Sequence, residues 1–318
     1  MRSLLFIDEP SIGIRAWGGS LVLWRKGHPE PLVFPPRIHH LRTIILAGHG
    51  ASISIEALRW LAREGVALYL MERSGECLAL FAAAPETDGR RRSLAIRQKQ
   101  FAAVLDPCRR MAIAKRIVAA KLRTLGLHPA DTQRFRAELR EARGLPDVLT
   151  VEAHAGVSFY MQFRGAEMRF KDKVPGHWRV FVARSTTYLR GKMGTSKARY
   201  ASAPWNAALN YAFGVALGQC TRAVIGAGLD PCFGFLHAPK PGRLSLPYDV
   251  LELHRADLTR KVFAFCQGRT FSSGDFETTR EGIVRLSAPV AKDVATVALR
   301  TAPITECVKT VKRVITWF

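Results

Sequence analysis

The pattern of apolar residues changes once along the chain, and this change limits the possible folds more than any other feature. Before residue 85, short apolar or alternating runs are separated by glycine and proline, a pattern typical of β-strands. After the turn-forming segment 85–89, apolar residues recur at helical spacing. We therefore predict an α+β fold with a small N-terminal β-sandwich over residues 1–85, a linker over residues 86–93 and a larger all-helical domain over residues 94–318.

Prolines and polar caps divide the predicted helical domain. Pro107 should break the helical stretch 94–125, and Asp147 can act as the N-cap of a helix that reaches about residue 163. Pro204 and Pro247 suit the first turn of two further helices, which should end near residues 227 and 267.

The charge of the chain indicates its partner. Forty-eight Lys and Arg residues stand against 26 Asp and Glu residues, giving a formal net charge of +22. Such an excess favours a polyanionic partner, and we expect nucleic acid. No apolar run is long enough to span a membrane, and the apolar start is too short for a signal peptide, so we expect a cytoplasmic protein without membrane contact.

Four residues are candidates for catalysis, and each also has an ordinary explanation. Glu152 stands near the start of a predicted helix, where a carboxylate stabilises the helix dipole. His237 ends an apolar run and could be a core histidine with a satisfied side chain. Asp249 and Glu252 are three residues apart on a predicted helix and could lie together on an exposed face.

Together, these side chains predict a divalent metal site. Carboxylates with one imidazole are suitable ligands for Mg²⁺ or Mn²⁺. An acidic cluster within a strongly basic chain suits phosphodiester chemistry on DNA, because basic residues can grip the backbone while acids hold the metal ion at the scissile phosphate.

Three segments carry motifs in a defined order. Glu152 and Tyr160 are eight residues apart on one predicted helix, and the segment 204–211 reads Pro-Trp-Asn-Ala-Ala-Leu-Asn-Tyr. The segment 228–255 contains Gly-Leu-Asp-Pro, then Gly-Phe-Leu-His, then Leu-Pro-Tyr-Asp-Val-Leu-Glu. In this order, the motifs closely resemble those of the CRISPR-associated integrase/endonuclease of the spacer-acquisition module, the CRISPR-associated protein one family.

This resemblance implies a set of roles. The metal ligands would be Glu152, His237 and Glu252, with Asp249 as a neighbouring functional acid. The N-terminal β-sandwich would mediate a homodimer, which would assemble with CRISPR-associated protein two. The assembly would capture a short double-stranded DNA, whose 3′-hydroxyl ends attack the CRISPR repeat and insert a spacer by transesterification.

Further residues are candidates for DNA contacts. The polar, glycine-containing segment 164–202 is predicted to be mostly loop, and its cations could contact the DNA backbone or remain solvated. Tyr160 and Asn206 could line the site or pack between helices. His254 could approach the metal or lie at the surface. The candidates are Tyr160, Arg184, Lys192, Lys197, Arg199, Asn206 and His254.

Three functions are consistent with these features. The first is the metal-dependent integrase and endonuclease of spacer acquisition. The second is a metal-dependent structure-specific nuclease, or a transposon-type integrase, outside adaptive immunity. The third is a non-catalytic DNA-binding scaffold, for which replacing Glu152 by Ala would leave strand transfer unaffected.

Overall fold

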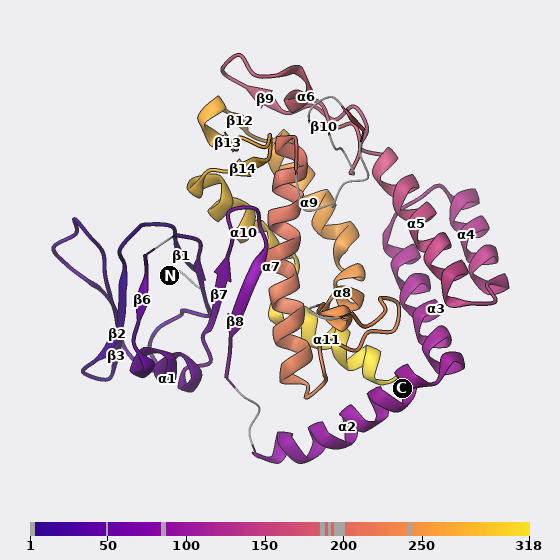
Figure 1. The fold of residues 1–318 in the computed structure, drawn as a ribbon, viewed down its shortest axis with the longest axis horizontal. Coiled ribbons are helices and arrows are strands. Elements are labelled where there is room, and N and C mark those ends of the chain that lie inside the picture. The colour runs from indigo at the N-terminus through magenta and orange to yellow at the C-terminus, as the bar shows by residue number, and fades with distance from the viewer. Residues whose placement is uncertain are drawn as a thin grey trace. The chain divides into compact units, whose positions relative to one another are not determined.

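The computed structural model describes residues 4–48, 50–83, 87–184, 188–189, 192–193, 201–240 and 243–318 (Figure 1). The chain divides into two compact units, Met1–Ala84 and Pro85–Phe318. The first unit is built from strands and one helix, and the second is mainly helical, so the predicted α+β class is confirmed.

Two four-stranded sheets form the first unit. One sheet has the order β1-β5-β7-β8, where β1 (Leu4–Ile7), β5 (Thr43–Leu46) and β7 (Ala67–Met71) are parallel and β8 (Cys77–Phe81) is antiparallel to β7. The other sheet has the order β4-β3-β2-β6. Its strands are β2 (Gly13–Trp17), β3 (Ser20–Trp24), β4 (Leu32–Phe34) and β6 (Ser52–Ile53).

Among the described residues of this unit there is one helix, α1 (Ile55–Arg63), and it shares a core with both sheets. Ser54 is its N-cap, as its side chain accepts a hydrogen bond from the backbone N–H of Ala57. Trp60 and Leu61 of α1 are buried in one apolar cluster with side chains from both sheets. Apolar side chains of both sheets and of α1 therefore form the common core of this unit.

The second unit begins with four consecutive helices. These are α2 (Thr87–Leu105), α3 (Pro107–Thr124), α4 (Pro129–Glu141) and α5 (Leu145–Met161). The prediction of a linker over residues 86–93 is wrong from Thr87 onward, because polar residues that favour turns also favour the first turn of a helix. Pro107 separates α2 from α3 as predicted, with the Asp106 side chain capping α3.

Asp147 does not cap α5 in the position predicted for it. The N-cap of α5 is Gly144, and the Asp147 carboxylate instead accepts hydrogen bonds from the backbone N–H groups of Arg143 and Gly144. With these two N–H groups bonded to its side chain, Asp147 lies inside the helix, and α5 begins two residues before it. Glu152 consequently lies beyond the first two turns, so the explanation of this residue as a helix-capping acid is wrong.

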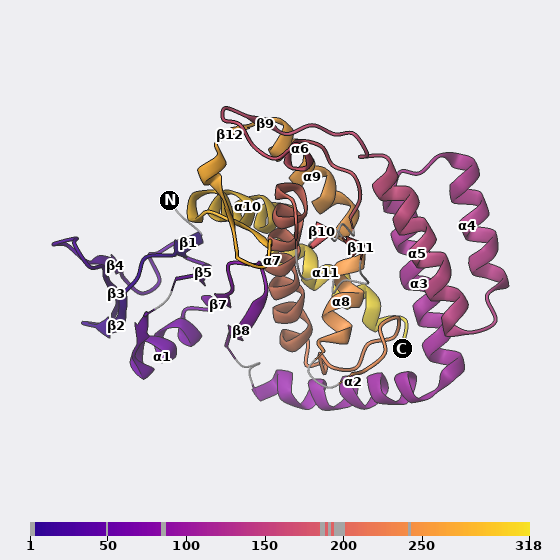
Figure 2. The same cartoon turned by 45° about the horizontal axis from the view of Figure 1, so that its top comes forward.

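Helix α7 (Pro204–Gly226) forms the centre of the second unit (Figure 2). Seventeen of its 23 residues are buried, as expected for a helix that is apolar on all sides. Around it pack α8 (Ser245–Glu252), α9 (Arg255–Gln267), α10 (Ala288–Thr301) and α11 (Ile304–Ile315). Helix α3 packs on α4 and α5 and also touches α8 and α9, which brings α5 and α8 to the same part of the unit.

The helix predicted to run from Pro247 to residue 267 is two helices. The backbone N–H groups of Leu253 and His254 bond to the carbonyls of Val250 and Leu251, which closes α8 with a tight turn before α9 starts at Arg255. Glu252 is thereby the last residue of α8. None of the helices in the described part of the chain is both long enough and apolar enough to cross a membrane.

Small strands interrupt the helical unit. They are β9 (Arg169–Phe170), β10 (Tyr188–Leu189), β11 (Lys192–Met193), β12 (Thr270–Phe271), β13 (Phe276–Thr278) and β14 (Val284–Leu286). The short helix α6 (Gly176–Arg179) and a 3₁₀ turn, Ser273–Asp275, complete the unit. The segment 164–202, predicted as mostly loop, thus contains a few short elements, and β9 pairs in parallel with β12 beyond α9.

Candidate active site

Two of the predicted acids meet at one cation. Lys121 of α3 donates hydrogen bonds from its Nζ to Glu152 Oε1 of α5 and, at 2.6 Å, to Glu252 Oε2 of α8. Lys121 and Glu252 are 4% and 2% exposed, whereas Glu152 is half-buried. The structure therefore brings together two carboxylates that are 100 residues apart in sequence, around a buried ammonium group.

A second cation contacts one of these carboxylates, that of Glu252. A guanidinium nitrogen of Arg255 lies 3.1 Å from Glu252 Oε1, and the guanidinium also lies over the ring of Phe213, 5.0 Å from its centroid. Burial alone would raise the pKa of Glu252, but Arg255 and Lys121 outweigh burial and hold that pKa at about 2. Burial would likewise lower the pKa of Lys121, yet Glu252 and Glu152 raise it above its usual value. Both groups are therefore charged at neutral pH.

His237 and Asp249 form a separate, tightly bonded pair. Asp249 is 0% exposed and lies on the buried face of α8. Its Oδ1 lies 2.7 Å from His237 Nδ1 and accepts the backbone N–H of His237 at 3.0 Å. Its Oδ2 accepts the backbone N–H groups of Phe235 and Leu236 at 2.6 and 3.1 Å. All the hydrogen bonds to this carboxylate thus hold the turn that carries His237.

This pairing fixes the protonation of the imidazole. An ionised carboxylate can only accept hydrogen bonds, so Nδ1 of His237 must carry the proton in its bond to Asp249. In the neutral imidazole, the lone pair is then on Nε2. A carboxylate that orients a histidine in this way is typical of metal-binding histidines.

Gly234 allows this turn to approach α8 closely. A Cβ at this position would lie 2.9 Å from Asp249 Oδ2, 2.8 Å from the carbonyl carbon of Ser245 and 2.9 Å from the carbonyl oxygen of His237. Two of these atoms are backbone and cannot move aside easily. The glycine of the Gly-Phe-Leu-His motif is therefore required by the close approach of backbone to backbone.

The predicted metal ligands Glu152, His237 and Glu252 do not surround a single point in the structure. Within the described ranges, no group of three or more His, Cys, Asp or Glu side chains is arranged to hold a metal ion. Glu152 and Glu252 both face Lys121, while His237 is engaged by Asp249 through Nδ1.

The donor set nevertheless fits a divalent ion in kind. Two carboxylates already converge on a common cation, and the imidazole of His237 is held through Nδ1 by Asp249, which lies on the same helix as Glu252. Oxygen donors with one imidazole nitrogen are ligands that Mg²⁺ and Mn²⁺ accept. A metal ion would have to take the place that the ammonium of Lys121 holds between the two carboxylates.

Two predicted DNA contacts are instead internal. An NH group of Arg184 donates to Asn210 Oδ1 at 2.6 Å, and its guanidinium lies over the ring of Phe213. Burial lowers the pKa of Arg184, although the neighbouring Tyr160 acts in the opposite direction. Asn206 is 3% exposed and donates to the carbonyl of Ala183 at 3.2 Å. Arg184 and Asn206 thus join the segment before residue 185 to α7. For Asn206 this is the packing role that the sequence left open, and contact of either residue with DNA stays a prediction.

The other candidates have mixed outcomes. Tyr160 lies on α5, the helix that carries Glu152, and its hydroxyl is 3.5 Å from Thr259 Oγ1 of α9. His254 Nε2 lies 3.0 Å from Thr310 Oγ1 of α11, so this histidine faces α11, and burial lowers its pKa. Lys192 belongs to β11, whereas Lys197 and Arg199 lie outside the described residues.

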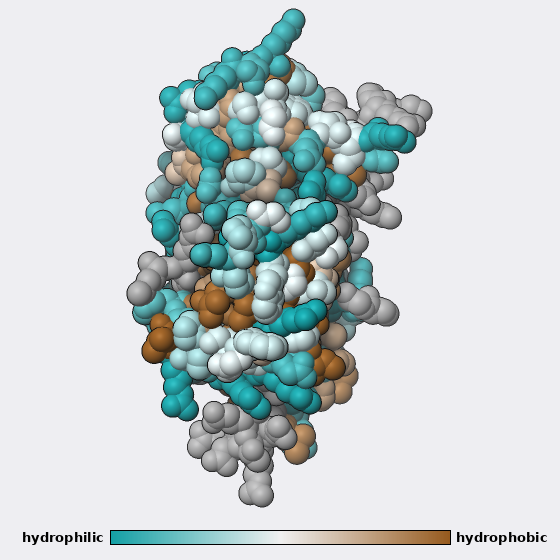
Figure 3. All heavy atoms as spheres, turned by 90° about the vertical axis from the view of Figure 1, so that its left-hand side faces the viewer, coloured by the Kyte–Doolittle hydropathy of each residue, from teal (hydrophilic) through white to brown (hydrophobic). Residues whose placement is uncertain are grey.

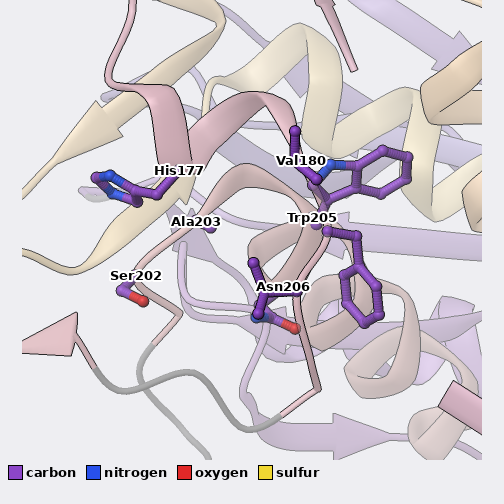
Figure 4. A pocket seen from close by; sticks show the side chains of 8 residues that line it. His177, Val180, Ser202, Ala203, Trp205 and Asn206 are labelled. Carbon is purple, nitrogen blue, oxygen red and sulfur yellow. The ribbon is translucent and has the colours of Figure 1, made fainter. Parts of the chain in front are cut away.

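A small pocket opens elsewhere, between the segment that contains α6 and the start of α7 (Figure 4). Its lining residues include His177, Val180, Trp205 and Asn206, and it has a volume of about 20 Å³. This is about the space of one water molecule. No acid lines the pocket, so it is distinct from the carboxylate centre.

Lys121 is the residue that the sequence analysis missed. It follows Ile113 and Ile117 at successive spacings of four residues, which places it on the buried face of α3. A lysine in that register is buried only if it is paired. Its position therefore gave a signal that an acid would be found opposite it.

Solved structures of other proteins have the same fold as this chain. A casposase bound to an integration product aligns with a TM-score of 0.77 at 23% identity, covering 94% of this chain and 82% of that one. A Cas1 protein from Thermotoga maritima aligns with a TM-score of 0.77 at 14% identity, covering 99% and 96%. A complex named Cas6-RT-Cas1–Cas2 contains a chain that aligns with a TM-score of 0.71 at 15% identity, covering 98% of this chain and 35% of that one. The fold is that of the Cas1 proteins and the casposase.

Sequence comparison then gives the family. The chain belongs to the family "CRISPR associated protein Cas1", whose family model matches residues 5–298. A relative from Pyrobaculum aerophilum, named CRISPR-associated endonuclease Cas1 2, is 29% identical over 283 residues, which is 88% of each chain. CRISPR-associated endonuclease Cas1 3 of Thermus thermophilus is 27% identical over 289 residues, covering 89% of this chain and 80% of that one. The family predicted from the ordered motifs is confirmed.

Proposed function

We propose that this protein is a metal-dependent DNA integrase and endonuclease that inserts short DNA duplexes into a CRISPR repeat array. Its membership of the Cas1 family supports a nuclease or integrase. The observation that carries the finer proposal is the convergence of Glu152 and Glu252 on one cation beside a histidine that Asp249 orients. This arrangement supports metal-assisted phosphodiester chemistry.

In this proposal, Glu152, Glu252 and the Nε2 atom of His237 hold one Mg²⁺ or Mn²⁺ ion. When bound, such an ion polarises a phosphoryl oxygen and stabilises the attacking and leaving oxygens. Asp249 keeps the proton of His237 on Nδ1, so that Nε2 remains available. The positive charge of Arg255, held against Glu252, favours the approach of a phosphate group to this otherwise acidic centre.

The reaction is a transesterification that needs no energy-rich cofactor. The 3′-hydroxyl oxygen of the incoming duplex attacks a phosphorus atom of the repeat, a new P–O bond forms, and the bond to the original 3′ oxygen breaks. That oxygen leaves with a proton, so one phosphodiester replaces another. Hydrolysis by the same site differs only in that water takes the place of the 3′-hydroxyl.

We propose that exposed arginines of α3 bind the DNA backbone. Arg109, Arg116 and Arg123 are exposed and spaced by seven residues, so they lie along one side of α3, on a different side from the buried Lys121. From the first to the third, this row extends about 21 Å at 1.5 Å per residue. A row of guanidinium groups of this length suits several successive phosphates.

Partners follow from the family resemblance. We propose a homodimer formed through the first unit, where Trp17, Ile38 and Ile55 are 75%, 73% and 63% exposed, and the face drawn in Figure 3 has apolar side chains among hydrophilic ones. Assembly with a Cas2 protein is proposed as well, since a Cas1–Cas2 complex contains a chain of this fold. A cytoplasmic location, next to the repeat array, is part of the same proposal.

One experiment separates the proposed activity from related ones. The protein is incubated with Mg²⁺ or Mn²⁺, a labelled duplex with free 3′-hydroxyls and a supercoiled plasmid, with or without a CRISPR repeat and with or without the cognate Cas2 protein. We expect labelled duplex joined to the plasmid at the repeat. Cleavage without joined product would contradict the integrase and leave a nuclease.

A second candidate is a transposon-type integrase outside adaptive immunity. It is favoured by the shared fold with a casposase bound to an integration product. It predicts joining that is equally efficient on plasmids with and without the repeat. A non-catalytic scaffold, by contrast, predicts DNA binding without joined or cleaved product under any metal condition.

A further inference from the structure

The ammonium group of Lys121 stands where the proposed function needs a metal ion. It is buried, it comes from α3, and it donates to Glu152 of α5 and to Glu252 of α8. Three helices are thus joined at one positive charge. In the described part of the chain, Lys121 is the residue that contacts both carboxylates.

Two carboxylates that share a poorly solvated site repel each other unless a cation lies between them. Arg255 contacts Oε1 of Glu252, whereas Lys121 contacts Oε2 of Glu252 and Oε1 of Glu152. Without Lys121, the metal-free protein would have to move the two acids apart, protonate one of them or admit water. Lys121 therefore determines where both acids stand before a metal ion arrives.

We propose that Lys121 is a positioning residue that holds Glu152 and Glu252 together in the metal-free protein and gives up this place when the divalent ion binds. This inference rests on the proposed function, because it takes the two acids to be metal ligands. The protein's own cation then competes with the metal ion for the same oxygens. Competition would keep the site assembled yet make its metal affinity weaker than the ligands alone would allow.

The site does not leave room for both cations in their present contacts. Nζ bonds to Glu252 Oε2 at 2.6 Å and also to Glu152 Oε1, so the ammonium occupies the space between the two carboxylates that one metal ion bound by both of them would need. On metal binding, the lysine must shift its hydrogen bonds to other acceptors. Its flexible four-carbon stem permits this, whereas the planar group of an arginine is less able to adapt.

Metal affinity of the Lys121→Met variant tests the proposal. Methionine keeps the unbranched apolar stem, one atom shorter, but removes the charge. We expect Mn²⁺, measured by calorimetry on the full-length protein without DNA, to bind this variant at least about tenfold more tightly than the wild type, because a nearby positive charge and a competitor are lost. A purely structural lysine would leave the affinity unchanged.

Lys115→Met is the matched control. Lys115 lies on the same helix, and its Nζ donates to the carbonyls of Arg140 and Ala142 at 3.0 and 2.7 Å, so it touches backbone and no carboxylate. We expect its removal to lower stability without changing the Mn²⁺ affinity. If both variants bind Mn²⁺ as the wild type does, the role of Lys121 is refuted while the metal site stands. If none of the three proteins binds Mn²⁺, the proposed function itself fails.

A second measurement applies even if Lys121→Met does not fold. In protein labelled with ¹⁵N-lysine, a buried ammonium gives a side-chain signal that is absent from the Lys121→Arg variant. We expect this signal to shift or disappear as diamagnetic Mg²⁺ is added, with the same saturation as binding. A signal that stays in place at saturating Mg²⁺ would overturn the proposal.

Discussion

Replacing Asp249 by Asn should damage the protein far more than a near-isosteric change normally does. Each oxygen of Asp249 accepts two hydrogen bonds: Oδ2 from the N–H groups of Phe235 and Leu236, and Oδ1 from the N–H and Nδ1–H groups of His237. An asparagine has one oxygen and one NH₂ group. While His237 keeps its proton on Nδ1, the NH₂ group faces two donors whichever way the amide is turned, and two hydrogen bonds are lost.

The magnitude follows from these contacts. A hydrogen bond to a charged group contributes about 1.5–3 kcal/mol, so the loss of two is expected to lower the free energy of unfolding by about 3–6 kcal/mol. Asp249 is 0% exposed, so water cannot replace the lost acceptor. A domain is typically stable by about 5–15 kcal/mol, so this loss is a large fraction of the total.

Urea unfolding of the metal-free protein measures this effect. The control is Asp147→Asn, because there a single oxygen, Oδ2, accepts both backbone N–H groups and the Asn oxygen can replace it. We expect the control to lose no more than about 1 kcal/mol. If Asp249→Asn is within 1 kcal/mol of the wild type, the deduction that all four hydrogen bonds hold the His237 turn is wrong.

Two further predictions concern neighbouring positions. The pKa of Glu252 is lowered from 4.5 to about 2, so its ionisation should contribute about 3 kcal/mol of stability above pH 4.5, which is lost as the pH falls toward 2. Between pH 5 and 3, the free energy of unfolding should therefore fall more steeply for the wild type than for Glu252→Gln. Equal slopes for the two proteins would contradict the buried ion pair. Gly234→Ala should lower stability by about 2 kcal/mol or more, because its Cβ would meet backbone of Ser245 and His237. The control Gly156→Ala, where a Cβ meets nothing within 4 Å, should be neutral or stabilising, and similar melting temperatures for both variants would refute the steric explanation.

The sequence predicted the elements whose signals are local. Pro107 and Pro204 begin helices α3 and α7 where expected, since proline favours the first turn. Local signals were less reliable near residue 87, where turn-forming residues form the first turn of α2, and after Glu252, where α8 ends without a glycine or proline to announce it. Helix ends that depend on packing leave no such mark in the sequence.

The acids of the candidate site were predicted, but their ion pairs with Lys121 were not. Glu152 and Glu252 were chosen as ligands, and the structure places them at one cation. Lys121 was missed, because a lysine on an apolar face shows its partner only when three helices pack together. Arg184 was expected to face DNA from a basic loop, but it packs against Phe213 and Asn210, contacts that no sequence spacing reveals.

Strand joining tests the central claim most directly. A labelled duplex is presented with Mn²⁺ and a repeat-bearing plasmid, once with 3′-hydroxyl ends and once with 3′-deoxy ends, to the wild type and to Glu152→Gln. We predict joined product only for the wild type with 3′-hydroxyl ends. Equal joining by Glu152→Gln, or joining of the 3′-deoxy duplex through its 3′ ends, would contradict a carboxylate-dependent transesterification at this site.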